Sequence, residues 1–409
     1  MYGINIAKNT LYQVLARLIS SGSTVLIILL IARHFPINVY GDFTKVTAFV
    51  SLFYLIADFG FNAIFLQHEE NRLRFRDLLY SRISLGLLLI VIVNLSTFFL
   101  PYNPLLHTGF SPAVRIGIAL FSFTILTEAI LYTALAIFQR ELKYQYFVLS
   151  SFIGAVVTVI GVSFTVAYSL SFNSLFISFL IAAVAEAAVA LFFTEEALLP
   201  IKFDTRFFIR LSKETLPIGL LLVFNLIYFR IDIFLLSILR SSTDVALYDL
   251  AYKFFDFLIA LPLFLSNALY PKLLVDQKNN RIQKTNIKKY IGVFILLALP
   301  LVAVMWIISP FIHLIKPDFA PASVPLRLLV LSLPVFFATS IMQWILITKK
   351  QQKFLAYVYL FSLIVNIILN LILIPQYGYI ASAIITGISE LGVFIVLWIK
   401  LFRKELSNI

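Results

Sequence analysis

The chain has 409 residues, of which 61% are hydrophobic and only 13% are charged, and its mean hydropathy is +0.98. A soluble domain contains roughly 45 to 50% apolar residues, so this composition excludes a soluble globular protein and predicts a polytopic membrane protein. Cysteine is absent, which excludes disulfides, thiolate metal sites and cysteine nucleophiles.

Apolar segments of about 20 residues, the length that crosses a bilayer, follow one another along the whole chain. The first is longer than the core of a signal peptide and no small-residue cleavage pattern follows it, so we expect it to remain as a span. The expected spans of the first half are 10–32, 43–66, 81–100, 112–138, 146–168 and 173–193. Those of the second half are 216–239, 246–271, 290–308, 325–347, 354–374 and 379–399.

A charged segment, TEEALLPIKFDTRFFIRLSKETLP, separates the two sets of spans and indicates a linker between lobes 1–205 and 206–409. Short matches indicate that the lobes are related: VYGDFTK at 39–45 is similar to LYDLAYK at 247–253, and QRELKY at 139–144 to KKQQKF at 349–354. Six spans per lobe give both lobes the same orientation. We therefore predict an all-α polytopic membrane protein, with about twelve transmembrane helices in two parallel-repeat six-helix lobes around a central cavity.

Lysine and arginine in the predicted loops decide the orientation, because short cytoplasmic loops accumulate these residues. With a cytoplasmic N-terminus most of them, Arg82 included, fall on the inside, and the outer loops hold only Arg33, Lys45, Arg240 and Lys316. Twelve spans then place both termini in the cytoplasm. The same bias accounts for the formal net charge of +12, which in a soluble protein would indicate nucleic-acid binding.

Several kinds of chemistry have no motif in this chain. Neither GxxxxGK[ST] nor GxGxxG occurs, so the sequence contains no recognisable nucleotide cradle. The four histidines, His34, His68, His107 and His313, fall in predicted loops far apart in the sequence, which favours surface positions over a metal site. The outer loops are shorter than the extramembrane region that sugar-transferring enzymes usually have. We therefore predict no catalytic site, no metal site and no cofactor, and the sequence disfavours an enzyme.

Charged residues inside the predicted spans cost at least ~2.5 to 3.5 kcal/mol each at the centre of a bilayer. Such a cost indicates either a water-filled interior or ion pairs that hold helices together. For Asp249 and Lys253 the alternative is snorkelling to the interface, and for Glu128 and Glu186 it is helix pairing. The charged residues of the spans are Arg17, Asp58, Glu128, Glu186, Arg230, Asp232, Asp249, Lys253, Asp256 and Glu390.

Helical spacing places several polar residues on common faces. Arg230 and Asp232, two residues apart, point roughly 200° away from each other around a helix and cannot pair. Interior prolines, at Pro262, Pro300 and Pro334, permit kinks in the second lobe. The polar faces suit a central cavity, although helix packing accounts for the uncharged positions almost as well. The shared faces are Asp249, Lys253 and Asp256; Asn366 and Asn370; and Ser382, Thr386 and Glu390.

Several segments are similar to those of a known family. They are VYGDF and ADFGFN in the first lobe, YFRID, ALYDLAYKFFDFLIALP and ALYPKL in the second, and NIILNLILIPQYGYIASAIITGISE near the C-terminus. The last segment resembles a recurring Asn, Ile-Pro-x-Tyr-Gly and Ser-Glu pattern, from which it departs at Ile380 and Ala381, where Gly-Ala is usual. The chain thereby resembles the polysaccharide transport branch of the multidrug/oligosaccharidyl-lipid/polysaccharide exporter (MOP) superfamily, the Wzx-type O-antigen flippases.

The resemblance implies a lipid-linked oligosaccharide on an undecaprenyl-pyrophosphate carrier, moved from the cytoplasmic to the periplasmic leaflet of the bacterial cytoplasmic membrane by alternating access. It also implies membrane lipids, a polysaccharide polymerase and a chain-length regulator as partners. Because a pyrophosphate is a polyanion, Arg17, Arg230 and Lys253 are candidates for its site. The candidates for polar cavity contacts or ion coupling are Asp58, Glu128, Glu186, Asp232, Asp249, Asp256, Asn366, Asn370 and Glu390.

Two other functions remain open from the sequence. An ion-coupled drug or organic-cation antiporter of the same superfamily would use Asp58, Glu128, Asp232 and Asp256 to bind a cation. A cavity of net positive charge favours the flippase, and one of net negative charge favours the antiporter. A membrane-embedded polysaccharide polymerase or ligase is the less favoured third function.

Overall fold

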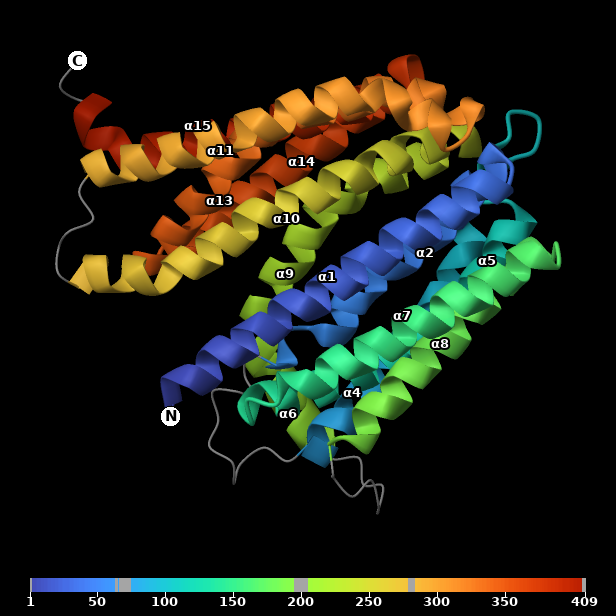
Figure 1. Ribbon diagram of the computed structural model, residues 1–409, viewed down its shortest axis with the longest axis horizontal. Helices are drawn as coiled ribbons and strands as arrows, with labels where there is room; N and C mark the ends of the chain where they lie inside the picture. Colours follow the sequence, from blue (N-terminus) through green and yellow to red (C-terminus); the bar gives the residue numbers. More distant parts are fainter. Residues whose placement is uncertain (1, 63–64, 66–74, 195–204, 279–283, 407–409) are drawn as a thin grey trace. The chain divides into compact units, whose positions relative to one another are not determined.

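The computed structural model describes residues 2–62, 65, 75–194, 205–278 and 284–406 (Figure 1). Within these residues the chain is helical, apart from short 3₁₀ segments, turns and one hairpin of two-residue strands. Helices satisfy every backbone N–H and C=O inside one segment, which a bilayer without water requires. The all-α class predicted from the apolar segments is confirmed.

The helices form two sets, before and after residue 205. The first set comprises α1 (Tyr2–His34), α2 (Ile37–Asp58), α4 (Phe75–Ser96), η1 (Thr97–Phe99), the strands β1 (Tyr102–Asn103) and β2 (Thr108–Gly109), α5 (Pro112–Ser122), α6 (Thr124–Arg140), α7 (Tyr144–Ala167) and α8 (Phe172–Phe192). The second comprises α9 (Thr205–Leu239), α10 (Ser242–Lys278), α11 (Lys284–Ile308), η2 (Ser309–Leu314), η3 (Pro317–Ala322), α12 (Ser323–Leu331), α13 (Leu333–Thr348), α14 (Gln352–Tyr377) and α15 (Tyr379–Leu406).

The chain divides into two compact units, Met1–Leu226 and Ile227–Ile409. The division lies inside α9, because the first half of this helix packs into the first unit. Leu211 is 2% exposed in a core cluster with Phe61 and Phe65, and Gly219 lies against the Phe59 ring. The lobes that the sequence repeats define are a separate division of the chain. We still propose that this division lies between residues 205 and 206, next to the start of α9.

The two units pack their helices in corresponding pairs. In the first unit α2 packs on α5, α4 on α6, α6 on α8, and α7 on α8. In the second unit α10 packs on α12, α11 on α13, α13 on α15, and α14 on α15. This recurring pattern supports the parallel repeat that the short sequence matches predict.

The fourth predicted span of each unit is interrupted at one residue, but only the second unit bends sharply there. In the first unit a single residue, Phe123, separates α5 from α6. In the second unit a single residue, Ser332, separates α12 from α13, and the two helices meet at a bend of 40°. An irregular segment precedes each broken span: η1 with the β1–β2 hairpin in one unit, and η2 with η3 in the other. The units therefore share local irregularities as well as helices.

Eight helices among the described residues are long and apolar enough to cross a membrane, and two bent helix pairs raise this number to ten. The other two predicted spans, 10–32 and 216–239, lie within α1 and α9, which contain side chains outside the described part. A polytopic membrane protein is confirmed. The count of twelve and the central cavity remain predictions.

Bends in the second unit follow the proline prediction only in part. The break in the fourth span lies directly before Leu333 and Pro334, at the predicted place. The bend in α10, of 45°, falls at Pro271 and not at Pro262, while Pro300 lies inside the continuous helix α11. A proline removes one helix hydrogen bond and thereby permits a kink, and the helix ends or bends only where its neighbours leave room.

Lys45, expected in an outer loop, is instead a buried structural residue, 1% exposed. Its ammonium donates a hydrogen bond to the carbonyl of Gly109 at 2.7 Å. Nearby, Arg115 donates to the carbonyls of Leu100, at 2.7 Å, and Phe110, at 3.2 Å. These bonds hold the β1–β2 hairpin against α2 and α5. Lys45 therefore carries no information about the orientation of the chain.

Candidate functional site

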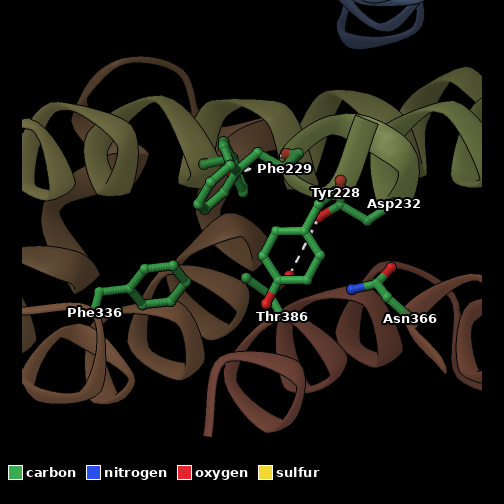
Figure 2. Close-up of a pocket in the computed structure, with 7 residues that line it drawn as sticks. Tyr228, Phe229, Asp232, Phe336, Asn366 and Thr386 are labelled. Carbon is green, nitrogen blue, oxygen red and sulfur yellow. Dashed lines mark hydrogen bonds between the residues drawn. The ribbon is translucent and has the colours of Figure 1, made fainter. Parts of the chain in front are cut away.

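The second unit contains a buried polar network centred on Asp232 of α9. This residue is 4% exposed, and its carboxylate accepts a hydrogen bond from the Tyr248 hydroxyl of α10. A second hydrogen bond comes from Thr386 Oγ1 of α15, at 3.2 Å (Figure 2). The backbone N–H of Ile233 donates a third bond at 2.7 Å. A carboxylate that leaves water needs such donors. Hydroxyl and backbone groups are thus its direct partners.

A second carboxylate, Glu390, lies one helical turn beyond Thr386 on α15. It is 1% exposed and accepts hydrogen bonds from Tyr228 Oη of α9, at 3.0 Å, and from the Thr339 hydroxyl of α13. Both donors are uncharged. Glu390 therefore connects three helices of the second unit through hydroxyl groups.

The two asparagines of α14 extend this network. Asn370 Nδ2 donates to Asn366 Oδ1 at 2.8 Å, and Asn366 Nδ2 donates to Ser389 Oγ at 3.2 Å. Ser382 Oγ donates to Asn370 Oδ1 at 3.3 Å. The polar faces predicted on the last two spans thus face each other, and both asparagines are buried. The helix-packing interpretation describes their position.

A small cavity lies inside this network. The cavity volume that the centre of a water molecule can occupy is about 10 Å³. One water molecule needs roughly this volume. An oligosaccharide or a pyrophosphate does not fit, whereas a water molecule does. Figure 2 shows Asp232, Thr386 and Asn366 around it, with aromatic rings on the other sides. The lining residues are Tyr228, Phe229, Asp232, Tyr252, Phe336, Asn366 and Thr386.

Arg230, on the same helix as Asp232, has a different environment. Its guanidinium pairs with Asp256 of α10 at 3.3 Å, and the two side chains are 24% and 40% exposed. The guanidinium also lies 5.4 Å from the centre of the Tyr252 ring. A guanidinium has five N–H donors, and among the described residues Asp256 takes one of them. Arg230 can therefore bind a further anion without leaving its partner.

The three charges of α10 share one face, as their spacing predicts. Lys253 lies 3.9 Å from Asp249, with 28% of the lysine side chain and 5% of the aspartate side chain exposed. Asp256 pairs with Arg230 of the neighbouring helix. Asp249 is thus buried against its neighbours, whereas Lys253 is partly exposed. Lys253 and Arg230 are the partly exposed cations among the predicted site residues of this unit.

The first unit buries an ion pair that the sequence analysis missed. Arg82, expected in a cytoplasmic segment, lies inside α4, is 0% exposed and pairs with Asp58 of α2 at 2.6 Å. It also donates to Thr133 Oγ1 at 3.3 Å, and its guanidinium lies 5.6 Å from the centre of the Phe61 ring. Only the apolar residues on both sides of Arg82 in LLYSRISLGLLL could have indicated burial. Asp58 is therefore neutralised by a cation.

Glu128 of α6 and Glu186 of α8 form the other acidic part of the first unit. The two carboxylates lie close enough for their charges to interact. The Glu186 carboxylate lies on Gly154 of α7, where an added Cβ would come within 2.6 Å of its Oε2 atom. Neither glutamate forms an ion pair within the described residues.

The side chain of Arg17, a predicted site residue, lies outside the described residues. Among the side chains that are described, no three His, Cys, Asp or Glu residues gather as a metal site. The oxygen atoms of Asp232, Thr386 and Asn366 are of the type that hard cations prefer, and the adjoining cavity matches one small ion or one water.

Buried charges and polar networks inside apolar helices are typical of membrane proteins that move a solute. Comparison with known proteins places the chain in a family. The model of a family described as polysaccharide biosynthesis protein matches residues 6–274, and a second family model, MatE, matches residues 217–372. Because the first match covers more than half of the chain, this protein belongs to the polysaccharide biosynthesis protein family. No curated protein matches the chain in sequence.

Solved structures share the fold at low sequence identity. The lipid II flippase MurJ in an inward closed conformation is 19% identical, with a TM-score of 0.76 over 96% of this chain and 87% of that one. An inward-facing multidrug resistance MATE family transporter of the MOP superfamily is 12% identical, with a TM-score of 0.74 over 97% and 96%. A MOP superfamily transporter from Pyrococcus furiosus, described as having a binding pocket of reverse polarity, is 13% identical, with a TM-score of 0.54 over 99% and 94%. The fold is thus that of the MOP superfamily.

Proposed function

We propose that this protein is a flippase. Its substrate would be an oligosaccharide repeat unit of O-antigen or another surface polysaccharide, linked to undecaprenyl pyrophosphate. The protein would move this lipid from the cytoplasmic to the periplasmic leaflet by alternating access. Membership of the polysaccharide biosynthesis protein family supports this substrate class. The observation that carries the proposal is the Arg230 guanidinium, which is partly exposed and has donors left for an anion.

The proposed anion site combines charge with a low-dielectric surrounding. Arg230 and Lys253 would contact the pyrophosphate. Planar N–H donors match phosphate oxygens in pairs, so an arginine fixes the orientation of the headgroup as well as its charge. With the cell interior negative, the outward step of an anion gains about 2.3 kcal/mol per charge per 100 mV. The sugars would contact polar side chains, and the polyprenyl tail would stay in lipid.

The buried network of the second unit is the proposed coupling element. Asp232 and Glu390 are carboxylates held by hydroxyl donors, and the cavity beside Asp232 accepts one small ion or water. Binding of a proton or a cation there would change the charge between α9 and α15. This change would alter how the two helices pack while the anion crosses.

An ion-coupled drug or organic-cation antiporter of the same superfamily is the second candidate function. Its support is the match of the MatE family model to residues 217–372 and the four carboxylates Asp58, Glu128, Asp232 and Asp256. The pairing of Asp58 with the fully buried Arg82 removes this carboxylate as a site for an organic cation. A polysaccharide polymerase or ligase remains less favoured.

The decisive experiment is deletion of the gene in the bacterium that carries it. We expect lipid-linked repeat units to accumulate on the cytoplasmic leaflet, where a lectin reaches them in inverted vesicles but not in intact spheroplasts. The wild-type gene should restore export, and Arg230→Ala should not. Absence of accumulation, together with new sensitivity to cationic drugs, would replace the flippase by the antiporter.

The proposed orientation places both termini in the cytoplasm of a bacterial inner membrane, and it has its own test. Because the chain has no cysteine, single cysteines can be labelled without background. Cysteines at Lys278 and Lys350 should react only when the reagent reaches the cytoplasm, and those at His107 and His313 should react from outside. Labelling of the position 278 cysteine from outside would reverse the orientation.

A further inference from the structure

A groove of the second unit lies between α14 and α15. Its volume is about 410 Å³, within the roughly 300 to 1,000 Å³ of small-molecule sites. Tyr357 and Phe361 of α14 form one wall and are 72% and 67% exposed. Ile388 and Val396 of α15 form the other wall.

Small residues create this groove. Gly392 has no side chain, and a Cβ added there would meet no atom within 4 Å. Ser362 and Ser389 form the floor together with it. Because both helices are membrane spans, the surrounding medium is hydrocarbon, and only an apolar chain or another apolar surface fills such a space.

The length of the groove narrows the choice of occupant. On α14 it runs from Tyr357 to Val365, which at 1.5 Å per residue is about 12 Å. Half of a hydrocarbon core of roughly 30 Å is about 15 Å. The groove therefore covers one leaflet, as a single acyl chain of a membrane lipid does.

Two lysines lie one helical turn beyond the same end of the groove. Lys353 precedes Tyr357 by four residues on α14, and Lys400 follows Val396 by four residues on α15. The ammonium of Lys400 lies 4.8 Å from the centre of the Phe354 ring, which keeps it beside α14. Basic pockets at the cytoplasmic ends of membrane helices bind anionic lipid headgroups, and this end is cytoplasmic in the predicted orientation.

Further positive charge gathers at this end of the unit. Burial, with the neighbouring charge of Lys284, lowers the pKa of the Lys349 ammonium below its usual value. Lys288 of α11 lies 5.3 Å from the centre of the Phe402 ring on α15. Like charges that crowd in this way repel one another, and an anionic headgroup relieves the repulsion.

We infer that the α14–α15 groove binds an anionic phospholipid of the cytoplasmic leaflet, with one acyl chain along Gly392 and the phosphate at Lys353 and Lys400. The floor of the groove also adjoins the polar network. Ser389 accepts a hydrogen bond from Asn366, and Asn366 lines the cavity beside Asp232. The occupied groove would therefore support the helix pair that holds the network.

The test uses the purified full-length protein in neutral detergent and native mass spectrometry. Phosphatidylglycerol and phosphatidylcholine with identical acyl chains are added, and bound lipid is counted against concentration. Two lysines near a membrane surface give an expected preference for phosphatidylglycerol of about thirtyfold. The double variant Lys353→Gln, Lys400→Gln should lose this preference. The matched control, Lys278→Gln with Lys289→Gln, changes exposed lysines of α10 and α11 and not of the two helices that form the groove, so this control should keep the preference.

A second variant tests the groove itself. Gly392→Leu fills it, and no neighbouring atom within 4 Å opposes the new side chain at its Cβ, so the protein should fold. Binding of both lipids should fall at least tenfold. Gly292→Leu on α11, the other open glycine of this unit, is the control and should bind as the wild type.

Three results would overturn the inference. Wild-type lipid binding by Gly392→Leu would place the lipid elsewhere. A change from dimer to monomer in Gly392→Leu would show that a second copy of the chain occupies the groove. A polyprenyl phosphate that displaces phosphatidylglycerol, while the lysine variants keep the wild-type preference for phosphatidylglycerol, would assign the groove to the substrate tail.

Discussion

The two units share helix pairing but stabilise their buried carboxylates in different ways. In the first unit a fully buried arginine, Arg82, neutralises Asp58 directly. In the second unit Asp232 and Glu390 accept bonds from hydroxyl groups, and Arg230 remains partly exposed with Asp256. One unit thus buries its cation between helices, and the other leaves its cation partly exposed. Repeated architecture does not imply repeated chemistry.

The last span of each unit shows the same difference. Glu186 on α8 lies on the backbone at Gly154. Glu390 on α15 is held by donors from two other helices, Tyr228 and Thr339. A carboxylate that packs on helix backbone changes its surroundings more easily than one fixed by two hydroxyl donors. Substitutions at corresponding places should therefore affect the two units unequally.

The largest effect is expected from removal of the buried cation. Arg82→Ala leaves Asp58 without its partner, and loss of one member of a buried ion pair costs about 3 to 5 kcal/mol of unfolding free energy. Membrane abundance and thermal stability in detergent should both fall sharply. The double variant Arg82→Met, Asp58→Asn removes both charges and should recover most of the loss. Normal stability of Arg82→Ala would contradict the structural role of this pair.

A smaller effect is expected where Glu186 lies on Gly154. Gly154→Ala puts a Cβ within 3.0 Å of the Glu186 Cβ and carboxyl carbon, and overpacking of this kind costs about 1 to 3 kcal/mol. The helix propensity of alanine offsets part of this cost. Gly387→Ala in the second unit, 3.3 Å from the Ser332 Cβ, is the control and should be milder. The double variant Gly154→Ala, Glu186→Ala removes the side chain that the new Cβ would contact, so it should restore thermal stability. If the double variant is less stable still, contact with Glu186 is not the cause of the destabilisation.

Threonine-to-valine substitutions compare how much one threonine hydroxyl contributes to the stability of each unit. Thr386→Val removes a donor to the Asp232 carboxylate, and hydrogen bonds to charged groups contribute about 1.5 to 3 kcal/mol. Thr124→Val in the first unit removes the partner of the Tyr54 hydroxyl, at 2.6 Å, and a neutral bond contributes about 0.5 to 1.5 kcal/mol. Thermal unfolding of both variants should show the larger loss for Thr386→Val. Equal losses would mean that Asp232 is uncharged in the folded protein.

The sequence was sufficient for the spans and for most of the buried charges. Apolar length defines a membrane helix whatever its neighbours are, so the described helices overlap the expected spans, although α2 (Ile37–Asp58) begins and ends several residues before the expected span 43–66. The hydrogen-bond partners of the buried charges could not be predicted from the sequence. For example, Thr386 and Asp232 are 154 positions apart, and no local pattern relates them. Lys45 and Arg82 were placed in loops because they lie near predicted span ends, where a few residues decide between loop and core. The same limit applies to the proposed anion site. Arg230 was identified because a charge inside a membrane span costs free energy, but the sequence left Asp256 as one of several possible partners.

The smallest effect on stability, and the largest on transport, is expected at Arg230. Its pair with Asp256 is partly exposed, and such pairs contribute only about 0.2 to 1 kcal/mol, so Arg230→Ala should reach the membrane in nearly normal amounts. If the guanidinium binds the pyrophosphate, this variant loses export, while Arg230→Lys keeps part of it, because the charge remains and the planar fork is lost. Membrane abundance measured beside export separates these roles.

The matched control is Arg240→Ala. Arg240 pairs with Asp244 at 2.7 Å and is 36% exposed, so this variant removes the same residue type from a similar pair outside the proposed site. It should leave export intact. A drop in abundance for Arg230→Ala as large as for Arg82→Ala would make Arg230 structural, and the two units would then use their arginines alike. Full export by stable Arg230→Ala and Lys253→Ala proteins, singly and together, would remove the cationic site, because no other partly exposed cation among the predicted site residues of the second unit could replace them.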